Sequence, residues 1–511
     1  MARMKREAWY EIARDLDWTL AYADEEAVFP EWMSGGEGIP REAWKAWDEP
    51  YKCAYPEYVA TQREKEASVY AVKAALQRSN IFEKLDEGWK STAKAHFGAV
   101  SLIEYLAVMA ELRMARFGLS PRWRNIAVYG ALDEVRHTQM DLAFAHEFVS
   151  RDPQYDWAQK AYHTNDWAIV ACRALFDGMM MNPSAVDIAL QLPFAFETGF
   201  TNLQFVALAA DAMGSGDVSF ANMISSTQTD EARHAQQGGP TLELLMEHDP
   251  ARAQWVVDKT FWGSARLFAI LTGPGMDYYT PLEHRKQSYR EFMEEWIVAE
   301  FLRLLEDYGL KRPWYWDEFM AGLDTWQHAL HLGVWCWRPT VWWHPQAGVS
   351  RAERAWLQEK YPRWEEQFGG IWDLIIRTVN QGAPERTLPV DMPWLCNLCQ
   401  LPIGTATGPR DLRYPVRSYP LTHNGRTHHF CSRPCRRIWW EDKDMLHHKT
   451  VVDRLLAGEI QPPTLSGILE YMGMTQEAMG RDAYDYRWAE EYRHAVAGGG
   501  SRDRTRDIRR A

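Results

Sequence analysis

The sequence has few cysteines, no excess of positive charge and no run of about 18 uncharged apolar residues. Seven cysteines in 511 residues are too few for a disulfide framework. With 70 acidic against 57 basic residues, the chain lacks the charge that nucleic-acid binding requires. The N-terminal segment also lacks the apolar stretch of a signal peptide. We therefore expect a cytoplasmic protein with no membrane span and no nucleic-acid partner.

Signatures of electron-carrying cofactors are also missing. No G-x-G-x-x-G follows a predicted strand, and there is neither a flavin signature nor a ferredoxin-type run of cysteines. Any electrons that the protein uses must therefore come from another protein.

Apolar and aromatic residues are abundant instead. Hydrophobic residues make up 46% of the chain, enough for a large core, and 26 tryptophans are several-fold more than ordinary usage. We expect most tryptophans to pack irregular chain against the bundle or a partner. Between residues 58 and 310, long amphipathic or apolar segments predict an all-helical domain. Helices are expected over residues 58–80, 90–117, 121–150, 164–181, 184–213, 217–247, 250–272 and 282–309, with breaks at 214–216 and 273–275.

Changes in composition divide the chain into six parts. They are an N-terminal extension packing on the bundle (1–57), the helical domain (58–310), a Trp-rich helical wrapping segment (311–390), a small four-cysteine module (391–450), a C-terminal helical segment (451–497) and a disordered tail (498–511).

Two copies of one motif supply candidate metal ligands. The strings at residues 133–137 and 230–234 share the pattern D-E-x-R-H, and two independent chance copies would be on the order of one in 10⁵. In each, Glu-x-x-His places a carboxylate and an imidazole on one helical face, where both can bind one metal ion. The pairs are Glu134 with His137 and Glu231 with His234. A third match, Glu491 with His494, lacks the longer pattern and is dismissed as chance.

One glutamate in an apolar run precedes each copy. Glu104 lies 30 residues before Glu134, and Glu197 lies 34 residues before Glu231. A carboxylate buried there would cost several kcal/mol unless it were paired or bound to a metal. Four carboxylates and two imidazoles are the donor set of ferritin-like di-iron or di-manganese bundles. The predicted fold is therefore mainly α, a ferritin-like bundle with extra helices and a small α+β cysteine module.

The other charged residues of the motif fit this site. Asp133 and Asp230 are expected to accept the free ring N–H of a ligating histidine, and Arg136 and Arg233 to balance those aspartates.

Beyond these motifs, the chain resembles the α (hydroxylase) subunit of the soluble bacterial multicomponent monooxygenases, in the toluene, isoprene and alkene monooxygenase branch. The strings that carry the resemblance lie at residues 48–51, 197–202, 228–236, 276–281, 313–316 and 460–462. The resemblance implies that Glu104, Glu134 and His137 hold one iron and Glu197, Glu231 and His234 the other, with Glu134 and Glu231 bridging.

The resemblance also implies partners and a reaction. These are β and γ subunits in an (αβγ)₂ hydroxylase, an effector protein, a ferredoxin and an NADH-dependent reductase. The expected reaction is O₂-dependent hydroxylation or epoxidation of a toluene-type aromatic, a short alkene or isoprene.

Helical spacing predicts the residues around the metal site. Within a turn of Glu104 lie Val100, Ile103 and Ala107. The face of Glu197 is shared or bordered by Leu192, Phe196, Thr201 and Phe205, and Gln228 lies three residues before Glu231. The resemblance implies that Phe176 and Met180 close the pocket. Thr201 and Gln228 are the candidates for orienting oxygen species and protons. Many toluene-hydroxylating relatives carry a very small residue at position 103, so Ile103 favours a smaller substrate.

A second candidate metal site lies in the cysteine module. Cys396-x₂-Cys399 and Cys431-x₃-Cys435 flank a hairpin signal at Asn424-Gly425, an order that suits structural zinc with four thiolate ligands. Free buried thiols are the alternative, and His428 and His429 are alternative ligands.

Two other kinds of di-iron protein are alternatives. The radical-generating subunit of ribonucleotide reductase would carry a tyrosine four residues after the first motif's histidine, where this chain has Asp141. Iron storage or a non-catalytic scaffold stays open as the alternative to an oxygenase.

Overall fold

The computed structural model describes residues 20–152, 167–336, 349–373, 395–403 and 418–443, with a few isolated residues besides. Several predictions lie outside the described residues: those for the tail, for most of residues 451–497, for the Trp-rich stretch at 337–344, for the string at 460–462 and for Glu491 with His494.

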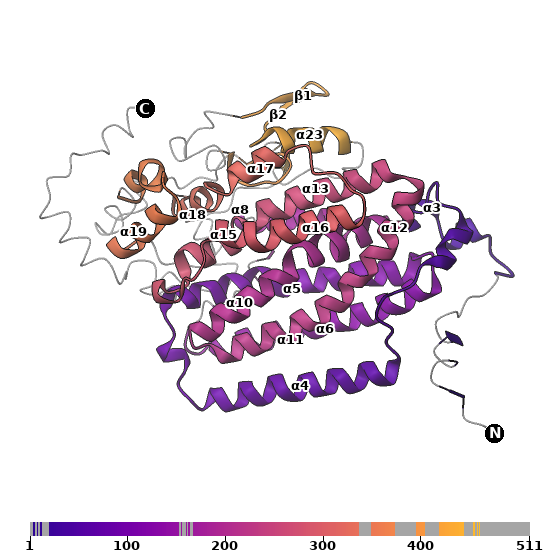
Figure 1. Cartoon of the computed structure of the whole chain (residues 1–511), viewed down its shortest axis with the longest axis horizontal. Coiled ribbons are helices and arrows are strands. Elements are labelled where there is room, and N and C mark those ends of the chain that lie inside the picture. The colour runs from indigo at the N-terminus through magenta and orange to yellow at the C-terminus, as the bar shows by residue number, and fades with distance from the viewer. Residues whose placement is uncertain are drawn as a thin grey trace, which may run out of the picture.

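The centre of the molecule is a bundle of long helices, as predicted (Figure 1). α5 packs along α6, α10 along α11, and α4 lies on the outside against α11. The bounds are α4 Tyr55–Gln77, α5 Glu87–Phe117, α6 Pro121–Phe148, α8 Trp167–Met180, α9 Ala185–Ala189, α10 Asn202–Gly214, α11 Val218–His234, α12 Gly238–His248 and α13 Pro250–Phe268.

Side-chain caps start several of these helices. The Asp86 carboxylate accepts a hydrogen bond from the Gly88 N–H at 2.8 Å at the start of α5, and Asp217 accepts one from Phe220 at 3.1 Å at the start of α11. Ser184, at the start of α9, accepts one from the Asp187 N–H at 3.0 Å. Such caps satisfy backbone donors that the first turn leaves free.

A π-helix, η4 (Leu190–Thr201), lies between α9 and α10. Pro193 lies inside this π-helix and, having no backbone N–H, cannot donate a helical hydrogen bond. The Thr198 hydroxyl donates a hydrogen bond to the Pro193 carbonyl at 2.8 Å. The helix type therefore changes from α to π within the segment that carries Pro193 and Glu197.

The helix expected over residues 282–309 is divided. The chain forms η7 (Leu282–His284), α15 (Tyr289–Phe292), a π-helix η8 (Met293–Val298) and α16 (Ala299–Asp307). The break predicted at 273–275 was also wrong: the turn comes at 269–271, and α14 (Thr272–Pro274) and the π-helix η6 (Gly275–Tyr279) follow. Glycine and proline at 273–275 are tolerated because they stand at the start of a new helix.

The C-terminal part adds short helices and one hairpin. In Figure 1, α17 (Trp316–Gly322) lies above the bundle beside α23 (Arg433–Asp442), with β1 (Leu421–His423) and β2 (Arg426–His428) at the top. α18 (Trp326–Cys336) and α19 (Arg351–Lys360) lie toward the left of the view. β1 and β2 pair antiparallel around Asn424 and Gly425, both at positive φ, which confirms the predicted hairpin.

Tryptophans join the outer segments to the bundle. Trp44 and Trp47, from the N-terminal extension, stack on Trp123 of α6 with ring centroids 5.8 and 5.9 Å away. Eight of the tryptophans that the structure describes are almost completely buried: Trp44, Trp47, Trp89, Trp123, Trp167, Trp262, Trp364 and Trp372.

Within the described residues, one helix, α5, is long and apolar enough to cross a membrane. Of its most apolar window, 67% is buried inside the protein, as in the core helix of a bundle.

Candidate metal centre

Four helical segments bring the six predicted ligands together in the bundle. α5 carries Glu104, α6 carries Glu134 and His137, η4 carries Glu197, and α11 carries Glu231 and His234. All six are buried, and their donor atoms form two groups in each of which every atom lies within 4.8 Å of the others. One group is Glu104, Glu134, His137 and Glu231; the other is Glu134, Glu197, Glu231 and His234. Glu134 and Glu231 belong to both, as two bridging carboxylates would.

The donor atoms fit a pair of cations. His137 Nδ1 lies 3.2 Å from a Glu231 oxygen and His234 Nδ1 lies 3.0 Å from a Glu134 oxygen. Both Nδ1 atoms, together with one oxygen each of Glu134 and Glu197, are buried and have no hydrogen-bond partner among the described residues. Buried polar atoms are rarely left unpaired, and metal ions between these atoms would satisfy them.

The metal-free cluster retains protons. Burial, and then the neighbouring carboxylates, raise the pKa of Glu104 and of Glu197 well above the ordinary value. Burial lowers the pKa of His137 and His234, but the surrounding carboxylates outweigh it and raise both pKa values well above the usual range. Since metal ligands must be deprotonated, these protons are displaced when cations bind.

The aspartates of the two motifs bind the histidines crosswise. His234 Nε2 lies 3.1 Å from Asp133, and His137 Nε2 lies 3.3 Å from Asp230, so each histidine pairs with the aspartate of the other motif. Arg233 contacts both aspartates and Arg136 contacts Asp230 at 2.8 Å. Each ring is thus held with Nε2 toward an aspartate and Nδ1 toward the metal cluster.

Sequence reasoning missed the contribution of α4. Gln62 donates to Asp133 at 2.5 Å and to Asp230 at 2.8 Å, and Lys65 donates to Asp230 at 2.5 Å. The Tyr58 hydroxyl donates to Asp133 at 2.9 Å. α4 thereby ties the two aspartates together. No motif marks these residues, although their spacing places them on one helical face.

A further buried glutamate of the bundle, Glu111, was also missed. It lies on α5, two turns after Glu104, and accepts hydrogen bonds from Gln237 at 2.8 and 3.0 Å. Burial raises the pKa of Glu111 to about 8, although His234 and Gln237 act in the opposite direction. The seven-residue spacing from Glu104 within an apolar helix is the signal that could have found it.

Glu111→Gln should stabilise the metal-free protein by about 3 kcal/mol at pH 7. The raised pKa means that folded Glu111 keeps its proton up to about pH 8, while the unfolded residue ionises near pH 4.5. The folded state therefore binds the extra proton, and wild-type stability falls as pH rises between these values. Urea unfolding from pH 5 to pH 8 should show a gap between variant and wild type that widens with pH, and parallel curves would contradict the prediction.

A cavity adjoins Glu104. It has a volume of about 100 Å³, well below the ~300 Å³ at which drug-sized pockets begin. Of the predicted pocket residues, those that line it are Val100, Ile103, Phe176, Phe196, Thr201 and Phe205. Ala107, Met180 and Leu192 are buried but do not line it, and neither does the half-buried Gln228.

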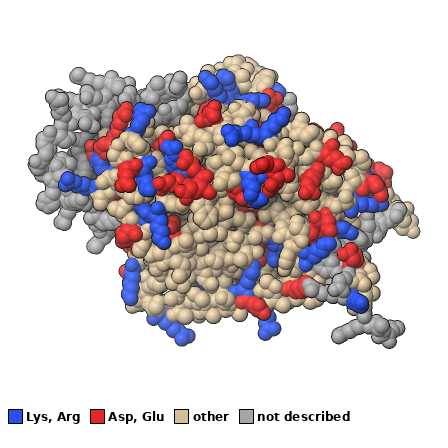
Figure 2. Space-filling view, in the orientation of Figure 1, with Lys and Arg blue, Asp and Glu red and all other residues tan. Residues whose placement is uncertain are grey.

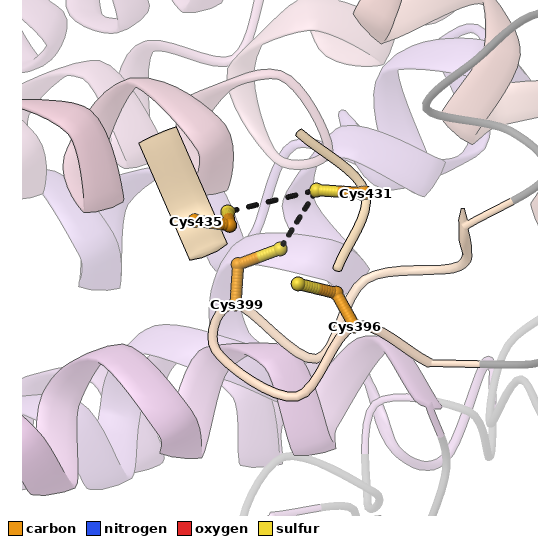
Figure 3. A group of neighbouring side chains, drawn as sticks. All are labelled: Cys396, Cys399, Cys431 and Cys435. Atoms are coloured by element: carbon orange, nitrogen blue, oxygen red, sulfur yellow. Dashed lines mark hydrogen bonds between the residues drawn. The ribbon is translucent and has the colours of Figure 1, made fainter. Parts of the chain in front are cut away.

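The four cysteines also converge, between α23 and the loop at residues 395–400 (Figure 3). Their sulfur atoms all lie within 4.8 Å of one another; Cys431 Sγ lies 3.7 Å from Cys399 Sγ and 3.6 Å from Cys435 Sγ. These separations exceed the S–S bond of ~2.05 Å and match the ~3.8 Å between sulfurs of a tetrahedral zinc site. Neither His428 nor His429 belongs to this group.

Comparisons with known proteins agree with this geometry. Residues 18–249 match the family model described as Methane/Phenol/Alkene Hydroxylase. The chain is 50% identical, over 96% of its length and 98% of the relative's, to the oxygenase component subunit alpha of the alkene monooxygenase system of Xanthobacter autotrophicus. It is 28% identical to the oxygenase component of a Pseudomonas phenol 2-monooxygenase, over 84% of this chain and 82% of that one. In fold it is similar to crystalline phenol hydroxylase from Pseudomonas sp. OX1, with a TM-score of 0.83, 23% identity and coverage of 97% and 100%.

A helical bundle that gathers two Glu-x-x-His motifs and two further glutamates defines a di-iron carboxylate protein. The chain belongs to the α (hydroxylase) subunits of the bacterial multicomponent monooxygenases and is the catalytic oxygenase subunit of such a system. The family membership favours the oxygenase interpretation over iron storage or a scaffold.

Proposed function

We propose that the substrate is a short alkene, which the enzyme epoxidises, rather than a toluene-type aromatic. The observation that carries the proposal is the small apolar cavity beside Glu104, with Ile103 in its wall. The name of the 50% identical relative, an alkene monooxygenase, supports the same substrate class. Product analysis with reconstituted components and a panel of alkenes, isoprene and aromatics tests it. Faster turnover of toluene than of propene would contradict it.

In this proposal the six buried ligands hold two iron ions. Glu104, Glu134 and His137 would hold one, Glu197, Glu231 and His234 would hold the other, and Glu134 and Glu231 belong to both groups of donor atoms. When bound, the two Fe(II) ions supply electrons to O₂. One oxygen atom enters the hydrocarbon and the other leaves as water, with two electrons that come from NADH and two protons.

The protein's own residues position the substrate and the protons. Aromatic side chains, Phe176 and Phe196 among them, exclude water and hold the hydrocarbon by shape. The Thr201 hydroxyl lines the cavity and has no hydrogen-bond partner in the part of the chain that the structure describes. It is free to donate a proton toward the site. We assign Gln228, three residues before Glu231, a supporting role in orienting protons.

Ile103→Gly should enlarge the accepted substrate. Ile103 is buried in the cavity wall, and removing its side chain frees space next to Glu104. We expect the ratio of kcat/KM for toluene to that for propene to rise at least about tenfold, the size of a modest change in pocket packing. Ala107→Gly, on the same helix but outside the cavity lining, is the matched control. An unchanged ratio in Ile103→Gly would remove Ile103 from the pocket.

The relatives are named as components of multicomponent systems, so other subunits are needed. We propose the β and γ subunits of an (αβγ)₂ hydroxylase, an effector protein, and a ferredoxin with its NADH-dependent reductase, all in the cytoplasm. Figure 2 shows few charged side chains over α10 and α11, where Val206 and Met213 of α10 are exposed. These helices adjoin the metal centre, and we assign this face to the effector.

We also propose a structural zinc ion in the four-cysteine module, on the basis of the sulfur separations. The six-part division of the chain stays a proposal with it. One part of this division, the packing of the N-terminal extension on the bundle, is supported by the stacking of Trp44 and Trp47 on Trp123 of α6.

A further inference from the structure

One face of α13 lies against the cysteine module. Trp255, Lys259, Trp262 and Arg266 follow each other at helical spacing and so share this face. Near the start of the helix, the Trp255 indole N–H donates to Asp442 of α23 at 2.9 Å, and Lys259 pairs with the same carboxylate at 2.8 Å. Further along, the Trp262 indole N–H donates to Cys435 Sγ at 3.2 Å. The module is thus joined to the bundle through one helix.

Arg266 requires a negative charge from the cysteines. Arg266 is only 1% exposed to solvent. Its Nη2 atom lies 3.9 Å from Cys431 Sγ, and its guanidinium carbon lies 4.4 Å from the centroid of the Trp326 ring. Among the described residues, no carboxylate forms an ion pair with Arg266. A buried cation without a counter-charge is strongly destabilising. Four thiolates around one Zn²⁺ carry two net negative charges, which would compensate the guanidinium.

The residues next to Arg266 form the wall of the hydrocarbon cavity. Leu267 and Phe268 line the cavity. Phe268 packs edge-on against Phe196 and Phe200 of η4, with ring centroids 6.1 and 4.9 Å away. Phe196 immediately precedes the candidate ligand Glu197. A shift of α13 at Arg266 would therefore reach both the cavity and η4.

We propose that the zinc-loaded cysteine cluster fixes the position of α13 through Arg266 and Trp262 and thereby sets the size of the hydrocarbon cavity. Arg266 and Trp262 are positioning residues that contact neither substrate nor iron. The inference rests on the proposed zinc ion and on the cavity as the hydrocarbon site. Packed contacts transmit small displacements. The path leads from Cys431 to Arg266 by a side-chain contact, along the backbone of α13 to Phe268, and from Phe268 to Phe196 by a ring contact.

The test compares the full hydroxylase carrying Arg266→Met, Arg266→Lys or Trp262→Phe with wild type. One readout is the rate of zinc release to a chromogenic chelator. The other is the rise in Tm caused by toluene relative to that caused by propene, which requires no turnover. We expect Arg266→Met to release zinc at least about tenfold faster and to raise the toluene-to-propene ratio at least about twofold. In Arg266→Lys, both the zinc-release rate and the toluene-to-propene ratio should stay closer to those of wild type, because lysine keeps the positive charge.

Arg354→Met is the matched control, because Arg354 is partly buried but pairs with Glu365 and Asp373, and it lines neither the cavity nor the cysteine cluster. It should change neither readout. Zinc release that is unchanged in Arg266→Met, or faster release with an unchanged ligand ratio, would overturn the proposal, as would purified wild type without zinc. If Arg266→Met does not fold, the same two measurements on Trp262→Phe test the proposal. This variant removes the indole N–H that donates to Cys435. Shifts in both readouts in an enzyme that oxidises no hydrocarbon would refute the proposed function but leave this coupling intact.

Discussion

Glu231→Ala should abolish hydrocarbon oxidation and leave the purified protein with little iron, while the helical fold remains. Glu231 belongs to both groups of donor atoms, so its loss removes an oxygen ligand from each iron position. His137 and His234, whose Nδ1 atoms lie 3.2 and 3.5 Å from its two oxygens, lose a partner at the same time. We expect turnover to fall at least about 10³-fold, as when a group needed for the chemistry is removed. Iron analysis, circular dichroism and product formation measure the three parts of this expectation.

A second glutamate provides the control. Glu491 also heads a Glu-x-x-His match but lacks the flanking aspartate and arginine of the two metal motifs. Glu491→Ala should retain the iron content and the turnover of wild type. Full activity in Glu231→Ala would refute the assignment of the site, and lost iron in Glu491→Ala would show that the longer motif does not distinguish ligands.

Asp230→Ala should destabilise the metal-free protein by about 3–5 kcal/mol, the cost of breaking a buried ion pair from one side. The residue is fully buried and contacts Lys65, Arg136, Arg233 and His137. Burial acts to raise the pKa of Asp230, but His137 and then Lys65 outweigh it and lower the pKa well below its usual range. The carboxylate is therefore charged, and its removal takes from Lys65 its ion-pair partner and leaves Arg136 and Arg233 with one carboxylate each, Glu66 and Asp133.

Urea unfolding of the metal-free variant measures this loss. The loss should shrink as pH falls through the low pKa of Asp230, because wild type then also loses the charge. Glu42→Ala, which breaks the exposed pair of Glu42 with Lys45, should change stability by less than about 1 kcal/mol. A loss in Asp230→Ala no larger than in this control would contradict the network described here.

The sequence could predict the metal centre because its ligands are marked by local spacing. Glu-x-x-His fixes two donors on one face of any α-helix, and an isolated glutamate in an apolar run needs a partner wherever the run folds. The crosswise pairing of Asp133 with His234 could not be predicted in this way. It depends on how α6 and α11 pack, and spacing within one helix carries no information about its neighbour.

The cavity was harder to predict for a different reason. Phe196 and Leu192 are both apolar and both buried, yet only Phe196 lines the cavity. The π-helix η4 changes which residues share a face, so an α-helical pattern misplaces side chains there. The sequence did not predict the contribution of Tyr58, Gln62 and Lys65, because polar residues on a long helix ordinarily face solvent.

The incorporation of oxygen from ¹⁸O₂ into the product tests the central claim most directly. The hydroxylase, reconstituted with its electron-transfer components and NADH, would be given propene under ¹⁸O₂, and the product analysed by mass spectrometry. We predict propene oxide that carries one ¹⁸O atom, formed by wild type and not by Glu231→Ala. A product whose oxygen comes from water, or NADH- and iron-dependent O₂ consumption without any oxidised hydrocarbon across the substrate panel, would contradict the assignment of this chain as a hydrocarbon monooxygenase.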